Sequence, residues 1–333
     1  MRWRWMSQPF TLILGVAVLV ALAFAVPALS RTMTEALIFA ILVVGLGVFI
    51  GNTGIVSFGH IAFAMIGAYA AAWQTCCPGI RQVFLPGLPD WLAALNVPLP
   101  LAAAVAMLLV GGVALVVGAI LLRLTGTAAS IGFLSFLFMV KTVFENWDEW
   151  TSGQSALVGL PLVVTPLAAG VGLALSILAA AAYRHSTSGL LVRAAREDEV
   201  AAHASGIRIW RERLVCLVLS AMIVALGGIL LGHNIGSISV NTFWLDLTFL
   251  TIAMLVVGGR MSLTGAVAGA VGLTLLRDSL RWLEQGVETP WGEFALPAGM
   301  QEVGLALAVL LVLILRPQGL VGLWEADIFR RRQ

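Results

Sequence analysis

The polar side chains best suited to chemistry lie in a ten-residue stretch, Gly51–His60, between two long apolar runs. Polar groups at membrane depth are costly and tend to face a path, whereas small residues there also allow close helix contacts. Both interpretations fit this stretch. His60 could carry a proton, but hydrogen-bonded packing is favoured because no second ionisable group lies nearby in the sequence. The candidate path or gate residues are Gly51, Asn52, Thr53, Gly54, Ser57, Gly59 and His60.

Motifs for catalysis or metal binding are missing from the sequence. It contains no G-x-x-x-x-G-K-[ST] nucleotide loop, no H-E-x-x-H zinc pair and no G-x-S-x-G serine motif. Its three cysteines, Cys76, Cys77 and Cys216, lack the paired C-x-x-C spacing of a metal site. We therefore expect a non-catalytic chain that binds no metal and no cofactor of its own.

Composition indicates the elements that must hold these residues. The chain of 333 residues is 60% hydrophobic and 11% charged, whereas a soluble domain is about one quarter charged. Its natural solvent is therefore lipid, in which helices satisfy their own backbone hydrogen bonds over about 20 apolar residues. We expect an all-α membrane bundle, a single domain over residues 1–333, with about ten spans and eight to ten possible. The candidate spans are 10–29, 34–50, 57–74, 99–122, 126–145, 165–183, 214–233, 246–259, 263–283 and 302–315.

The placement of Lys and Arg predicts the orientation, because short cytoplasmic segments are enriched in these residues. With ten spans and a cytoplasmic N-terminus, fourteen of the nineteen basic residues lie inside and five outside. Both termini are therefore predicted to be cytoplasmic. The inside set is Arg2, Arg4, Arg123, Arg184, Arg193, Arg196, Arg208, Arg211, Arg213, Arg260, Arg316, Arg330, Arg331 and Arg332, and the outside set is Arg31, Arg81, Lys141, Arg277 and Arg281.

Three loops fall on the outer side in this orientation. Residues 75–98 hold four prolines, and residues 146–164 and 284–301 are acidic. These loops could dock a soluble partner or could be solvated connections, and the sequence favours neither.

The segment 184–213 is the one long loop on the inner side. Ser188 is placed to cap a helix, Gly206 to end it, and alanines fill the residues between them. Val200, Ala204 and Ile207 would form one apolar stripe. Such a helix could lie on lipid headgroups or enter a groove of a partner protein, and the mixed charges favour the groove.

Five stretches of this sequence resemble motifs of a known family. Residues 196–202 followed by Gly206 resemble the "EAA" loop of ABC importer permeases. Residues 51–69, 258–265 and 316–320 resemble motifs of the branched-chain amino-acid permeases of the LivM type, as does the outer loop from Asn146. The resemblance covers about residues 35–325 in order. Met261 and Ala266 depart from the family's usual glycine and proline.

The resemblance implies the transmembrane subunit of an ATP-driven importer with a type II-like fold. Its partners would be a second, LivH-like permease, two LivG- and LivF-like ATPases carrying ATP and magnesium, and a periplasmic binding protein at the bacterial inner membrane. No nucleic acid is implied. The cargo would be branched-chain or related amino acids moved by alternating access, and urea, short amides or aromatic acids are the alternative cargoes of the same machinery. A secondary transporter, which works without an ATPase, is the less favoured alternative to the importer. The residues coupled to the ATPase would be Arg193, Arg196, Glu197, Asp198, Glu199, Ala201, Ala202 and Gly206, and a tight turn would need Gly258, Gly259 and Gly265.

Overall fold

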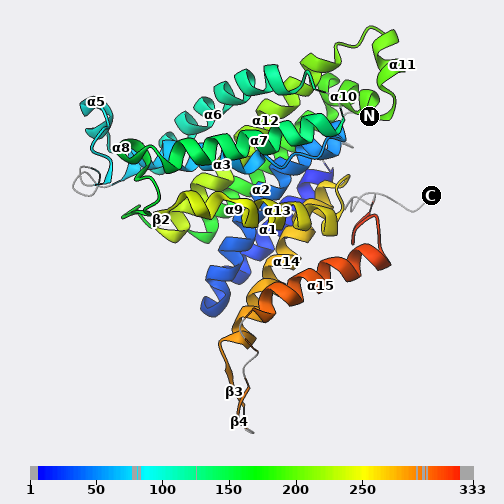
Figure 1. The fold of residues 1–333 in the computed structure, drawn as a ribbon. Coiled ribbons are helices and arrows are strands. Elements are labelled where there is room, and N and C mark those ends of the chain that lie inside the picture. Colours follow the sequence, from blue (N-terminus) through cyan, green and yellow to red (C-terminus); the bar gives the residue numbers. More distant parts are fainter. Residues whose placement is uncertain are drawn as a thin grey trace.

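The computed structural model describes residues 7–76, 81, 84–124, 126–289, 292–294, 297 and 299–322. The described chain is a bundle of long helices with short loops at its two ends (Figure 1). Arg2, Arg4 and Arg330–Arg332, which entered the orientation argument, lie outside the described residues. The long helices are α1 (Ser7–Ala25), α2 (Pro27–Thr53), α3 (His60–Thr75), α6 (Leu99–Leu121), α7 (Thr127–Glu145), α9 (Pro166–His185), α12 (Ile209–Ile235), α13 (Leu245–Gly258), α14 (Leu263–Glu284) and α15 (Met300–Leu315).

The prediction of a polytopic helical membrane protein is confirmed in its coarse form. Each candidate span overlaps one of these helices. By length and apolar composition, six segments of the described chain qualify as spans: α2, α6, α7, α9, α12 and residues 240–258, with residues 9–25 and α15 as shorter apolar helices. The count of about ten spans stays a prediction.

Helix α2 lies at the centre of the bundle. Pro27 stands in its first turn, where the missing N–H costs nothing. The helical conformation is interrupted at Val26, which is extended and separates α1 from α2. The predicted first span, 10–29, therefore ends earlier than expected. From Ala36 to Val44 every side chain is buried, because α2 packs against α1, α9, α12 and α14 around its circumference. A helix that is apolar all round requires such complete cover.

Helix α12 crosses α2, α3 and α6 and joins them into the core. The helices approach closely through small residues, as is usual where no hydrophobic effect drives association in lipid. A methyl group on Gly228 of α12 would lie 2.3 Å from the Ala64 carbonyl oxygen of α3. One on Gly67 of α3 would lie 2.8 Å from the Ala225 Cβ atom. These contacts leave no room for larger side chains at the α3–α12 crossing.

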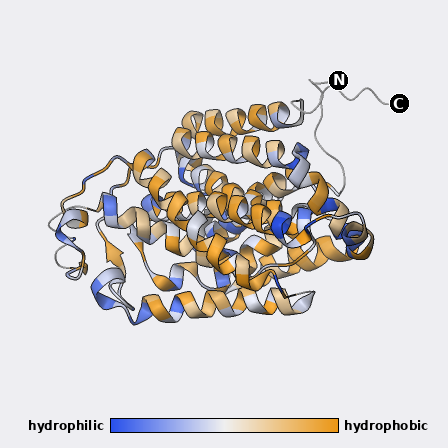
Figure 2. Cartoon of the chain, turned by 90° about the horizontal axis from the view of Figure 1, so that it is seen from above, coloured by the Kyte–Doolittle hydropathy of each residue, from blue (hydrophilic) through white to orange (hydrophobic). Residues whose placement is uncertain are grey.

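The outer helices present apolar side chains to their surroundings. In α6, Leu108 and Ile120 are 69% and 66% exposed, and hydrophobic residues cover the helices across the whole width of the bundle, as Figure 2 shows. Polar residues gather at the two ends. This distribution is that of a protein whose sides face lipid.

The end of the bundle opposite α10 (Thr187–Glu197) and α11 (Glu199–Ala204) carries packed loops. Arg81 is buried and donates to the carbonyl oxygens of Leu92 and Leu95 at 3.0 and 2.7 Å. The Ser152 hydroxyl donates to the Phe84 carbonyl at 2.8 Å, and the Gly87 N–H donates to the Glu149 carbonyl at 3.2 Å. The loops at 75–98 and 146–164 are therefore tied together where they are described, and not merely solvated. Short elements complete this end: α5 (Asp90–Ala93), α8 (Asp148–Thr151), the pair β1 (Leu157–Val158) and β2 (Ser237–Ile238), and η1 (Val240–Phe243). The hairpin of β3 (Val287–Thr289) and β4 (Gly292–Phe294) lies apart from them, beyond the end of α14 (Figure 1).

Candidate functional site

The loop between α9 and α12 forms two short helices, α10 and α11, and the prediction of one continuous helix is wrong. Asp198 lies between them in an extended conformation, and its carboxylate accepts from the Ala201 N–H at 2.9 Å. Ser186, and not Ser188, caps α10 by accepting from the Gly189 N–H at 3.1 Å. Aspartate competes for backbone donors more effectively at a cap than inside a helix, which explains the break. Gly206 takes the left-handed conformation as expected, with φ of 79°.

Helix α11 carries an apolar residue on its outward face. Ala202 packs against Ala195 and Ile209, which fixes the inner face of α11 on α10 and α12. Val200 is 81% exposed, and Ala201, His203 and Ala204 are exposed as well. In the predicted stripe, Val200 and Ala204 point outward and Ile207 is half-buried. The face that the sequence indicated as a partner surface is thus uncovered in the single chain.

A bidentate ion pair holds α11 against α12. The guanidinium of Arg213 donates to both carboxylate oxygens of Glu199, at 3.2 and 3.0 Å. The Arg213 side chain is nearly buried, while that of Glu199 is half exposed. The two planar groups fix each other's orientation, so Glu199 positions α11 and does not project freely toward a partner.

Arg196 of α10 connects three regions that the sequence had suggested separately. Its guanidinium donates to the Gly51 carbonyl near the end of α2 and to the Met261 sulfur in the turn before α14. Its Cγ would lie 2.9 Å from a Cβ placed on Gly54, where φ is +75°. The last carbonyl groups of a helix have no partner within the helix, and they attract cations. Arg196 also pairs with Glu197, and it therefore serves as an internal strut and not as a contact on the outer surface.

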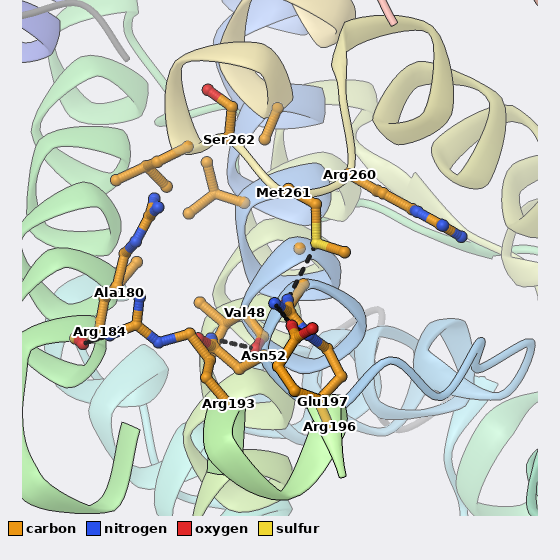
Figure 3. Close-up of a pocket in the computed structure, with 15 residues that line it drawn as sticks. Val48, Asn52, Ala180, Arg184, Arg193, Arg196, Glu197, Arg260, Met261 and Ser262 are labelled. Atoms are coloured by element: carbon orange, nitrogen blue, oxygen red, sulfur yellow. Dashed lines mark hydrogen bonds and ion pairs between the residues drawn. The ribbon is translucent and has the colours of Figure 1, made fainter. Parts of the chain in front are cut away.

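A cavity of 380 Å³ opens beside this strut (Figure 3). Its walls come from α2, α9, α10 and the turn before α14, and they include Asn52, Arg184, Arg193 and Arg196. Arg193 donates to the Arg184 carbonyl at 2.7 Å. Burial, and then the neighbouring guanidiniums of Arg184 and Arg196, lower the pKa of Arg193. Arg260 points away from the other labelled side chains (Figure 3).

The remaining candidate path residues form a polar chain inside the core. His60 Nε2 lies 2.9 Å from the Ser220 hydroxyl, which donates to the Gly45 carbonyl at 2.7 Å. Because Ser220 has used its only proton, it accepts from His60 Nε2–H. Nδ1, 2.6 Å from Ser57, is then left as the acceptor of the Ser57 proton. Neutral His60 thus has a partner for both ring nitrogens, and the chain joins α2, α3 and α12.

Packing around His60 is tight. The rings of Phe49, Phe63 and Phe133 lie with their centroids 5.1 to 6.1 Å from the imidazole. A methyl group on Gly59 would lie 2.1 Å from the Phe133 carbonyl oxygen. The narrow space between this segment and α13 has no room for a water molecule. This environment suits a hydrogen-bonded packing residue, the interpretation favoured from the sequence.

The predicted path residues therefore separate into two groups. Gly51 and Asn52 line the cavity beside Arg196, and Gly54 contacts that arginine. Ser57, Gly59 and His60 lie in the closed core. Thr53 belongs to neither group, because its hydroxyl donates to Phe49 of its own helix at 2.8 Å. The residues of Gly51–His60 were predicted as one site, and the structure divides them at Gly54.

The turn predicted around Gly258, Gly259 and Gly265 is present between α13 and α14. A methyl group on Gly258 would lie 1.9 Å from the Gly265 carbonyl oxygen, so the two helices touch there. The N–H groups of Leu320 and Val321 donate to the carbonyls of Val257 and Gly258 at 2.7 and 3.1 Å. The closing motif of the sequence thus covers the end of α13, and the turn is tight despite Met261 and Ala266.

Sequence reasoning missed three residues of this region. Ser220 is the one hydroxyl in the apolar run 214–231, and that isolation could have identified it as a buried hydrogen-bonding residue. Met261 had been noted only as a departure from a family pattern. Arg184 had been counted only as a positive charge. The sequence does not indicate that the latter two lie beside residues from α2 and α10. Among the described residues, no group of three His, Cys, Asp or Glu side chains is arranged to hold a metal ion.

Comparisons with known proteins identify the family of this chain. Residues 28–315 match the family described as "Branched-chain amino acid transport system / permease component". The High-affinity branched-chain amino acid transport system permease protein LivM of Salmonella typhimurium (strain LT2) and that of Escherichia coli (strain K12) are each 24% identical to the chain, over 89% of the chain and 70% of each relative. No solved structure matches. The chain belongs to the family of permease components of branched-chain amino acid transport systems.

Proposed function

We propose that this chain is a membrane-spanning subunit of an ATP-driven importer, and that the α10–α11 loop receives the motion of a separate ATPase subunit. The observation that carries the proposal is the double role of this loop. Its outer face exposes Val200, and its inner face reaches the end of α2 and the α13–α14 turn through Arg196. Movement of the loop would thereby displace both elements at once.

The orientation follows from the charge distribution. The α11 end of the bundle carries most of the basic residues, including Arg184, Arg193, Arg208 and Arg211, which supports a cytoplasmic position for it. An ATPase would then meet α11 from the cytoplasm. The packed loops at the opposite end would receive the periplasmic binding protein, in the inner membrane of a bacterium.

The cargo proposed is a branched-chain or related amino acid, because the two relatives are named for that transport. A second, related permease would complete the path, and two ATPase subunits would bind ATP and magnesium. Alternating access would follow from closure of those two subunits, which pushes α10 and α11 and thus the ends of α2 and α14.

The substitution Val200→Asp tests the partner surface. A carboxylate on the exposed apolar face would be desolvated in a groove, so we expect the ATPase subunits to co-purify at less than about a tenth of their normal yield. Val158→Asp, at the opposite end and 43% exposed, is the matched control and leaves ATPase binding unchanged. Normal ATPase binding by the Val200 variant would exclude α11 as the contact.

A further inference from the structure

A second cavity lies between the end of α6 and the start of α12, beside α11. It has a volume of 750 Å³, and arginines dominate its polar lining. Arg123 follows α6, Arg208 and Arg211 stand at the start of α12, and Arg213 is already paired with Glu199. Within the part of the chain described, the side chains of Arg123, Arg208 and Arg211 form no hydrogen bond or ion pair. The cavity thus holds three uncompensated positive charges.

The position of the cavity relative to the apolar helices is fixed by the α6–α12 crossing. A methyl group on Gly118 of α6 would lie 2.6 and 2.7 Å from the side chains of Leu217 and Leu214 of α12. From that level, Arg123 lies about one helical turn further along α6, and Arg211 lies about one turn back along α12. The arginines therefore sit immediately outside the apolar part of both helices.

The surfaces next to the cavity suit lipid. On α6, Leu115, Val116 and Ile120 are 53, 61 and 66% exposed and lead directly toward Arg123. Trp210, which lines the cavity, is 41% exposed. Tryptophan favours the level of the headgroups, where one part of the ring meets hydrocarbon and its N–H meets water.

We propose that this cavity binds the headgroup of an anionic phospholipid, with its acyl chains lying along the exposed face of α6. The phosphate and its charge would meet Arg123, Arg208 and Arg211, and Trp210 would pack beside the glycerol region. A basic pocket between helices at a membrane surface attracts such lipids by charge, and burial of the chains adds to the attraction. The bound lipid would also brace the start of α12, to which α11 is attached through Arg213.

The test compares lipids on the purified full-length chain. Phosphatidylglycerol or phosphatidylcholine is added to the protein in a neutral detergent, and lipid binding is followed by native mass spectrometry and by the thermal midpoint. We expect phosphatidylglycerol to bind and to raise the midpoint, and the combined variant Arg123→Gln, Arg208→Gln, Arg211→Gln to bind it about tenfold more weakly. Arg281→Gln, which removes an exposed charge at the far end of α14, is the matched control and retains binding.

Three results would overturn the proposal. Equal binding of phosphatidylcholine would show that charge does not select the lipid. Equal stabilisation by inorganic phosphate would show an anion site without a lipid. Unchanged phosphatidylglycerol binding in the combined variant, accompanied by loss of ATPase co-purification, would assign the cavity to an acidic protein segment.

Discussion

The bundle core and the α10–α11 loop differ in what holds their elements together. In the core, α3 and α12 meet through small residues such as Gly67 and Gly228, and backbone atoms approach to contact distance. In the loop, two arginine side chains make the main polar links: Arg196 reaches Gly51 and Met261, and Arg213 holds Glu199. Close backbone packing resists displacement, whereas a flexible side chain can follow it while keeping its hydrogen bonds.

The difference suggests how one chain can be both rigid and movable. The core would keep α2, α3 and α12 together as a single body. The arginine links would let the loop shift with a partner and still pull on the end of α2. Variants in the two regions should therefore fail differently: core variants lose stability, and loop variants lose transport.

The largest loss of stability is expected for Gly228→Ala. The added methyl group would lie 2.3 Å from the Ala64 carbonyl oxygen, so α3 and α12 must separate, which costs about 3 kcal/mol. The thermal midpoint of the detergent-solubilised protein should fall sharply. In Gly112→Ala the methyl group meets nothing within 4 Å, and that variant should be unchanged or slightly stabilised. Equal midpoints for the two variants would contradict close packing at the α3–α12 crossing.

A smaller loss is expected for Ser220→Ala. This change leaves the His60 Nε2–H without its acceptor and removes the bond that Ser220 donates to the Gly45 carbonyl, at a cost of about 1 to 2 kcal/mol. Ser176 offers a matched control, because it is also buried but bonds only to Gly172 of its own helix at 2.8 Å. Ser176→Ala should lower the midpoint less. A greater effect at Ser176 would refute the bridging role of Ser220.

The sequence predicted the membrane bundle because apolar runs are long and the bilayer sets a minimum length for each. It also predicted the left-handed Gly206, which depends on local residue types. The flanking long helices, α9 and α12, end at His185 and begin at Ile209, so the connection is shorter than the predicted loop 184–213. The sequence prediction failed at Asp198, where a cap divides the predicted helix. An aspartate can either cap a helix or lie on the solvated side of a helix interior. The packing of Ala202 on Ala195 and Ile209 selects the cap here.

The arrangement of the candidate site was less predictable. Gly51, Arg196 and Met261 lie far apart in the chain, and each motif alone indicates only a turn or a helix end. Their meeting depends on how α2, α10 and α14 pack, which periodicity does not specify. The exposure of Val200 was predictable, because an apolar residue among charges at a loop tip has nothing of its own chain to cover it.

Transport by the Arg196→Gln variant of the complete transporter tests the central claim most directly. The shorter neutral side chain cannot bridge Gly51 and Met261, but the exposed face of α11 is untouched. We expect normal assembly with the ATPase subunits and a loss of only about 1 kcal/mol in stability, because the hydrogen bonds of Arg196 are lost while the close-packed core is unchanged. Uptake of labelled leucine into proteoliposomes per ATP hydrolysed should fall at least about tenfold, while Arg281→Gln leaves it unchanged. Uptake per ATP equal to wild type in the Arg196 variant would contradict the role of this strut.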